Sequence, residues 1–74
     1  MYEVDTMELK IAMIEAKITT IESLSNATGV NRNTLSGVIN GNIYPSSNVM
    51  LAIAKALNLE SSRAGAIFFK KKLA

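Results

Sequence analysis

The sequence has no cysteine, no histidine and no tryptophan among its 74 residues, and it has only one proline. Without cysteine the chain can form neither a disulfide nor a thiolate metal site, and its absence suits a cytoplasmic setting. Without histidine or cysteine the chain also lacks the side chains best suited to proton transfer and nucleophilic attack at neutral pH. We therefore expect a protein that is not an enzyme and that binds neither a metal nor another cofactor.

The sequence also lacks the patterns of the common catalytic and membrane classes. It has no metal-ligand cluster, no phosphate-binding loop and no nucleophile paired with a base. Asp5, Glu8 and Glu15 are the carboxylates that could be taken for a catalytic pair, but the first two have the spacing of a helix cap. No run of about 18 apolar residues is present, and the first five residues carry two acids and no basic region. These features predict a small, soluble, intracellular binding domain.

Apolar residues make up 49% of the chain, which is too many for a disordered segment, and the net charge is +2. A chain of this length predicts one domain, spanning residues 1–74. Its radius of gyration should be about 11 Å, and a single core of this size should contribute only about 3–5 kcal/mol.

The apolar spacing is helical almost throughout, and residues that stop helices recur at regular intervals. The sequence therefore predicts an all-α fold, a compact bundle of five short helices. The helices are expected to start after Asp5, after Thr19 or Thr20, after Asn31, at Pro45-Ser46-Ser47 and near Ser61 or Ser62. The second to fourth are expected to end at Thr28, Ile39 and Leu57, and Thr19 with Glu22 has capping-box spacing.

The first helix has two apolar faces, one of which must enter the core. Leu9, Ala12, Met13 and Ala16 form one face, and Met7, Ile11, Ile14 and Ile18 form the other. The second face either packs under the C-terminal helix or remains free for a partner. The fourth helix is apolar over a wide arc and is expected in the middle of the domain. The fifth should turn Ala64, Ile67 and Phe68 inward, and Lys70 to Lys72 complement the negative end of its dipole.

The second and third helices have the pattern of a helix-turn-helix. Gly29-Val30-Asn31 joins them, and Gly29 supplies the positive φ that the bend needs. Ser25 supplies a small residue where the helices cross. The apolar residues expected to hold the two helices together are Leu24, Val30, Leu35 and Val38.

On residues 20–41, with Pro45-Ser46 and residues 54–59 in the same register, the sequence resembles the lambda Cro/repressor-type (XRE) helix-turn-helix family. The likeness covers about residues 8–69, and residues 66–74 look like the ends of short phage or prophage regulators of Gram-positive hosts. The resemblance implies a lambda repressor-like DNA-binding fold. It also implies a transcriptional regulator of the switch between lysogeny and lytic growth, acting in the cytoplasm of a bacterial host.

The resemblance places the helix of residues 32–39 in the major groove of operator DNA. Arg32 would then contact guanine or a phosphate, and Asn33 would pair with adenine. A plainer interpretation is that Asn31 and Thr34 only cap the helix while Arg32 is solvated. The residues implied in DNA binding are Arg32, Asn33, Thr34, Ser36, Gly37, Asn40 and Gly41.

An alternative keeps the fold and replaces DNA with a protein. Residues 33–54 carry no charged side chain, and Ile21 stands where the family commonly has a glutamine. The three terminal lysines are expected to lie away from this face, so few cations would meet DNA unless the protein forms a homodimer. The alternative function is an antirepressor or modulator of repression that binds the phage repressor through Ile21, Arg32, Ile43 and Tyr44. Ile43 and Tyr44 can equally be explained as a tucked-in loop.

Overall fold

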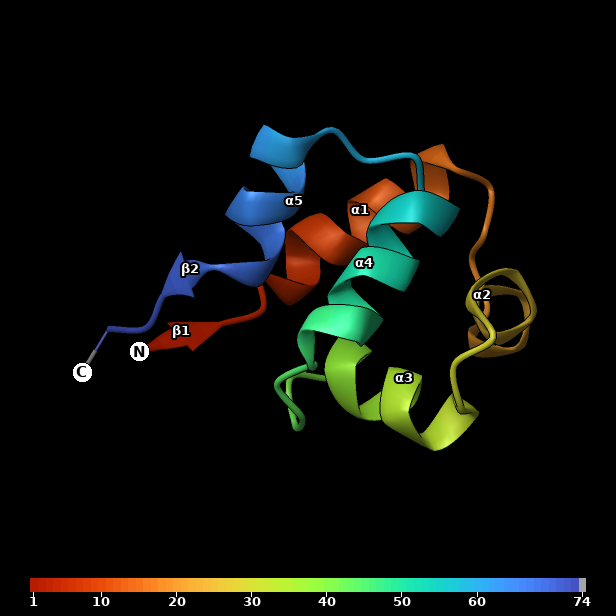
Figure 1. Cartoon of the computed structure of the whole chain (residues 1–74), viewed down its shortest axis with the longest axis horizontal. Helices are drawn as coiled ribbons and strands as arrows, with labels where there is room; N and C mark the ends of the chain where they lie inside the picture. Colours follow the sequence, from red (N-terminus) through yellow and green to blue (C-terminus); the bar gives the residue numbers. More distant parts are fainter. Residues whose placement is uncertain (74) are drawn as a thin grey trace.

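The computed structural model describes residues 1–73, and it has the predicted all-α architecture of five short helices (Figure 1). None of the helices in this part of the chain is long and apolar enough to cross a membrane. The predicted single domain runs to Ala74, which lies outside the described residues, and its extent stays a prediction. The helices are α1 (Thr6–Glu15), α2 (Ile21–Thr28), α3 (Arg32–Ile39), α4 (Ser47–Ala56) and α5 (Ser61–Phe68).

Each of the first four helices begins where a side chain can accept a hydrogen bond from a free backbone N–H. Asp5 accepts from Glu8 at 3.1 Å, and Ser46 accepts from Val49 at 3.3 Å. The predicted pairing of Thr19 with Glu22 is wrong. Thr20 is the N-cap of α2, and the capping box forms with Ser23 because its short hydroxyl reaches the Thr20 backbone N–H at 3.2 Å.

The core lies where the five helices meet, and the Cα radius of gyration is 11.1 Å, as expected. α1 packs against α3 and α5, while α2 packs against α3 and α4. Every helix contributes at least one fully enclosed apolar side chain, so the helices depend on one another for burial. The largest such residues are Phe68, Leu9, Leu24, Leu35, Ile53 and Ile67.

Two expectations about helix faces need correction or completion. α4 is not in the middle of the domain. Ile53 is the one buried residue among its ten, and Leu51 is 64% exposed. On α1, the second apolar face does not pack under α5: Met7, Ile11 and Ile14 remain exposed. Ala64, Ile67 and Phe68 of α5 do turn inward, Ala64 less completely than the others.

The two ends of the chain form a small antiparallel sheet that the sequence did not predict. β1 (Tyr2–Glu3) pairs with β2 (Lys70–Lys71), with Tyr2 opposite Lys71 (Figure 1). The rings of Tyr2 and Phe69 meet edge to face, with centroids 5.5 Å apart. Lys70 and Lys71 thus continue from α5 as a strand that holds the N-terminal segment against the bundle.

Candidate nucleic-acid interface

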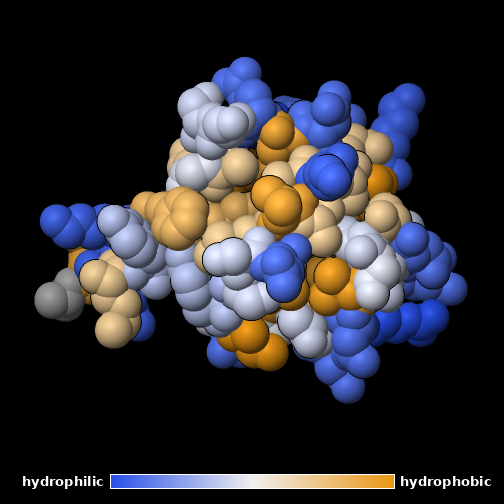
Figure 2. Space-filling model, in the orientation of Figure 1, coloured by the Kyte–Doolittle hydropathy of each residue, from blue (hydrophilic) through white to orange (hydrophobic). Residues whose placement is uncertain are grey.

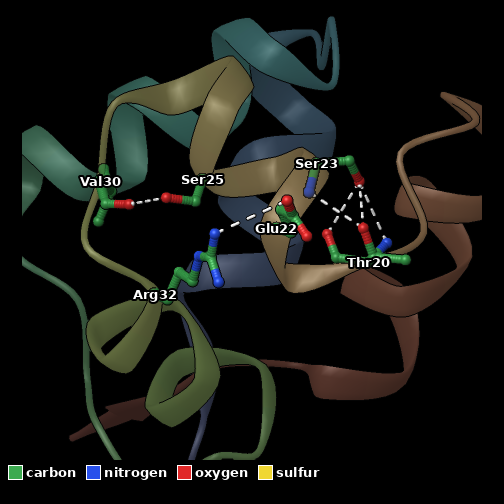
Figure 3. Close-up of polar contacts among 6 residues, drawn as sticks. All are labelled: Thr20, Glu22, Ser23, Ser25, Val30 and Arg32. Atoms are coloured by element: carbon green, nitrogen blue, oxygen red, sulfur yellow. Dashed lines mark hydrogen bonds and ion pairs between the residues drawn. The ribbon is translucent and has the colours of Figure 1, made fainter.

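A left-handed glycine and three hydrogen bonds build the turn between α2 and α3, and Figure 3 shows the bond between Ser25 and Val30. Gly29 adopts φ 74°, a left-handed backbone conformation that ends α2 and that residues with a Cβ atom rarely adopt. The Ser25 hydroxyl donates to the Val30 carbonyl at 2.7 Å. Thr28 donates to the Leu24 carbonyl at 2.7 Å and accepts from the Val30 N–H at 3.1 Å. These contacts satisfy the backbone groups at the end of α2 and fix the direction in which α3 starts.

The residues predicted to join the two helices lie at their contact. Leu24 of α2 and Leu35 and Val38 of α3 are fully buried, and Val30 packs partly against the same core. Asn31 caps α3 by accepting from the Asn33 N–H at 2.7 Å. The result is a rigid two-helix unit whose second helix presents one face outward.

Arg32 lies at the first position of α3 and reaches back toward α2 (Figure 3). Its Nη2 atom is 3.7 Å from Oε1 of Glu22, and the two side chains are 64% and 66% exposed. An ion pair this open contributes little, about 0–1 kcal/mol. A phosphate or a base edge can therefore replace Glu22 as the partner of Arg32 at small cost.

The outward face of α3 carries most of the other residues implied in DNA binding. Asn33 and Asn40 are exposed, and Ser36 lies half-buried between them, with its hydroxyl oxygen 3.4 Å from Nδ2 of Asn40. Thr34 is also half-buried and lies on the flank of the helix, as the 100° spacing requires. Gly41 follows α3 with φ 79° and ends it.

Gly37 sits on the same outward face, and Ile43 packs directly on it. A Cβ atom placed on Gly37 would lie 2.3 Å from Cδ1 and 2.5 Å from Cγ1 of Ile43, which is a clash. The Gly37 carbonyl also accepts from the N–H groups of Asn42 at 2.7 Å and Ile43 at 3.1 Å. The glycine therefore lets the loop after α3 fold back onto the helix. Ile43 thereby becomes part of the α3 surface. The sequence feature that indicates this packing is a glycine in the middle of a helix followed by an apolar residue in the next loop.

Overpacking at a tight contact costs about 1–3 kcal/mol, and alanine regains about 1 kcal/mol of helix propensity, so we expect Gly37→Ala to destabilise the protein by up to about 2 kcal/mol. In the Ile43→Ala background the two clashing atoms are absent and only the Cβ of residue 43 stays close, at 3.1 Å. The same change should then stabilise by up to about 1 kcal/mol, because alanine favours helix more than glycine does. Urea unfolding of the four proteins measures both effects. A stabilising Gly37→Ala in the presence of Ile43 would contradict the close packing.

Tyr44 and Ile21, the remaining residues of the predicted protein-binding set, are both partly covered by the protein. The Tyr44 hydroxyl donates to the Phe68 carbonyl at 2.6 Å, and burial, with a smaller effect of the nearby Tyr2, raises the pKa of Tyr44 above its ordinary value. Ile21 is half-buried, in a groove that it shares with Ile39 of α3. The loop is thus partly tucked in, while the Ile43 and Tyr44 side chains keep exposed surface.

A cleft of about 530 Å³ borders the end of α3, and two of the terminal lysines line it. Asn40 and Gly41 line it together with the N-terminal segment, and Lys70 and Lys72 line it as well. The pairing of β2 with β1 brings Lys70 and Lys72 to a cleft that the α3–α4 loop also lines, whereas the expectation that the terminal lysines lie away from the DNA-facing side of α3 stays a prediction. No sequence pattern links two-residue strands 68 residues apart.

The surface around these residues is mixed in character. In the view of Figure 2, hydrophilic side chains gather at the rim, whereas the middle, over α4, is mostly pale or orange. This agrees with the absence of charged residues between positions 33 and 54. Cations near α3 therefore come from its first residue, from Lys10 of α1 beside Ile39, and from the C-terminal segment with Lys70 and Lys72.

Two of the three acidic residues first considered for catalysis, Asp5 and Glu15, have structural partners. An Asp5 carboxylate oxygen caps α1, and the Glu15 carboxylate accepts a hydrogen bond from Arg63 of α5. Within residues 1–73, no three acidic side chains come together in a way that could hold a metal ion.

Comparison with known proteins agrees with this geometry. No curated protein and no solved structure is significantly similar to the chain. The family model described as "Cro/C1-type HTH DNA-binding domain" matches residues 8–61. This family comprises DNA-binding regulators and is not a class of enzymes, and the matched range contains the whole α2–turn–α3 unit. Because the match spans more than half of the sequence, the chain belongs to the Cro/C1-type helix-turn-helix DNA-binding domain family.

Proposed function

We propose that the protein is a phage or prophage transcriptional regulator that acts in the switch between lysogeny and lytic growth. It binds operator DNA as a homodimer in the cytoplasm of its bacterial host, with α3 in the major groove. The observation that carries the proposal is the rigid α2–turn–α3 unit, whose second helix offers Arg32 and Asn33 at its exposed N-terminal end. That end of the recognition helix contacts base edges in helix-turn-helix proteins.

The chemistry of the outward face suits the two parts of DNA recognition. Arg32 has the planar fork that pairs with guanine, and Asn33 has the amide that pairs with adenine. Ser36, Thr34 and the side-chain amide of Asn40 serve as phosphate donors, which position the helix but do not read sequence. The backbone N–H groups of residues 40–43, which the sequence suggested for this role, already donate to carbonyls of α3. Lys70 and Lys72, on the cleft beside Asn40, add phosphate contacts.

The first test is the binding of a labelled duplex of arbitrary sequence, followed by fluorescence anisotropy at several salt concentrations. An unknown operator is no obstacle, because phosphate contacts act on any sequence. If Arg32, Lys70 and Lys72 each meet a phosphate, the slope of log K against log salt should be about −2.7 for one protomer and about −5.4 for a dimer.

The variant Lys70→Gln/Lys72→Gln is the companion measurement. It should reduce the magnitude of that slope by about 1.8 per protomer. The structure gives these two side chains no ion pair within residues 1–73, so their loss should leave folding unchanged. An unchanged slope would remove the lysines from the interface but leave α3 in it.

A second candidate function is a modulator of repression that binds the phage repressor instead of DNA. The observation that favours it is the uncharged stretch of residues 33–54, with Ile43 exposed on the outward face of α3. Apolar and aromatic residues in a charge-poor patch are favoured at the cores of protein interfaces. The absence of DNA binding even at low salt is the result that this candidate expects.

A further inference from the structure

α1 exposes an apolar stripe that nothing in residues 1–73 covers. Met7, Ile11 and Ile14 are 71%, 38% and 64% exposed. The opposite face of the same helix, with Leu9, Ala12 and Met13, already supplies its contact with the core. A helix with two apolar faces therefore has one more than the domain needs, and an exposed contiguous stripe of this kind indicates an interaction surface.

The spacing of the stripe is that of a coiled-coil seam. Steps of four and three residues separate Met7, Ile11 and Ile14, so they occupy heptad positions d, a and d. Ile18 continues the spacing, but it follows the helix and packs partly against the core, so the seam has three members. Ile14 also lines an apolar groove of about 390 Å³ with Ile21 and Ile39, which extends the apolar surface beyond α1.

The charges beside the seam differ on its two sides. Glu8 and Glu15 take e positions on one flank, and Lys10 takes the g position on the other. In a parallel pair of helices a g residue lies opposite the e residue five positions later on the partner helix, which places Lys10 against Glu15 of a second copy. An antiparallel pair would bring like flanks together, acid against acid. The charge pattern is therefore complementary to itself in the parallel arrangement alone.

Both members of this pair are available for it. Lys10 is exposed and has no ion-pair partner among residues 1–73. Glu15 is bonded to Arg63, but its side chain is 56% exposed, and a carboxylate can accept several hydrogen bonds. A lysine from a second molecule can join this pair without displacing Arg63.

We propose that the α1 stripe is a homodimer interface. The α1 helices of two copies pair in parallel, with Met7, Ile11 and Ile14 at the seam and Lys10 of each copy opposite Glu15 of the other. The inference rests on the homodimer of the proposed function and names the surface that forms it, but it does not depend on DNA binding. A seam of three side chains is short and buries less than the roughly 800 Å² per partner of stable interfaces, so the dimer is weak and concentration-dependent.

The test is sedimentation equilibrium of the full chain over a range of concentrations. The wild-type protein should pass from monomer to dimer as its concentration rises. Lys10→Glu alone places acid against acid at both contacts of the homodimer, and Glu15→Lys alone places base against base, so each should stay monomeric over the same range. An equimolar mixture of the two variants restores both opposite-charge pairs and should dimerise like the wild type.

Two controls separate the pairing from folding and from net charge. Arg63→Gln removes the intramolecular partner of Glu15 and should leave dimerisation intact. Lys55→Glu changes the net charge by the same amount as Lys10→Glu, but on α4, and this variant should dimerise normally. Far-UV circular dichroism establishes that every variant is folded.

Three outcomes would overturn the proposal. A wild-type protein that stays monomeric at every concentration would leave the stripe to a different protein. Single variants that dimerise like the wild type would place the dimer interface elsewhere. A mixture that dimerises no better than its components would exclude the parallel register. A wild type that stays monomeric would also remove the homodimer from the proposed function. DNA binding itself is tested separately by the anisotropy titration, so a failure of this interface and a failure of DNA binding are distinguishable.

Discussion

Replacement of Leu35 by alanine is expected to leave most of the protein unfolded at room temperature. Leu35 lies on the buried side of α3 with none of its surface exposed. Removing a fully buried leucine side chain costs about 2–5 kcal/mol, from lost apolar burial and the cavity left behind. A domain of this size has a core worth only about 3–5 kcal/mol. The loss is therefore comparable to the whole stability of the domain.

Leu51→Ala is the matched control for this change. It makes the same substitution on α4, where the side chain is 64% exposed, and it should alter the free energy of unfolding by no more than about 0.5 kcal/mol. Urea unfolding followed by circular dichroism measures both variants. A cost below about 1 kcal/mol for Leu35→Ala would contradict its place in the core, since only exposed positions tolerate the change so well.

The helix-turn-helix was the part of the fold best predicted from the sequence, because local signals set its limits. Gly29 ends α2 through its own φ angle, and Asn31 starts α3 through a hydrogen bond two residues along the chain. Neither signal depends on distant contacts. The bounds Arg32–Ile39 therefore agree with the prediction, and α2 ends at Thr28, about where it was expected to end.

The parts that could not be predicted depend on contacts between distant segments. A helical wheel separates the two apolar faces of α1, but it does not say which one other helices will cover. The same limit applies to α4, whose wide apolar arc suggested a central helix although Leu51 faces outward. The pairing of Tyr2 with Lys71 joins the two ends of the chain, and neither strand is long enough to show alternation.

The candidate interface was limited in the same way. Arg32 and Asn33 were found from their place at the start of a helix, which is a local property. Ile43 was assigned to a separate protein-binding set, yet it packs on Gly37 and belongs to the outward face of α3. The place of Lys70 and Lys72 on the cleft beside Asn40 could not be predicted, because nothing in the sequence indicates the sheet that brings them there.

Loss of the Arg32 charge is expected to have the largest effect on DNA binding of any surface substitution. If the guanidinium pairs with a guanine, Arg32→Gln should cost about 1–3 kcal/mol per protomer, or about 5- to 150-fold in affinity, since each 1.4 kcal/mol is a factor of ten. If the guanidinium contacts a phosphate instead, the magnitude of the slope of log K against log salt should decrease by about 0.9 per protomer. Lys55→Gln removes one charge from the far end of α4 (Figure 1) and should change the affinity much less.

Removal of the neighbouring acid, Glu22, is expected to change DNA affinity in the opposite direction. Glu22 lies 3.7 Å from Arg32, and both side chains are largely exposed. Binding to DNA must break this weak pair and bring a carboxylate toward the phosphates. Glu22→Gln should therefore raise DNA affinity at low salt, and the gain should shrink as salt screens the charges.

Anisotropy titrations of Arg32→Gln and Glu22→Gln at two salt concentrations test both predictions. If Arg32→Gln and Glu22→Gln both leave affinity and salt slope unchanged, α3 does not meet DNA through its N-terminal end. The uncharged face around Ile43 would then be better explained as a protein-binding surface.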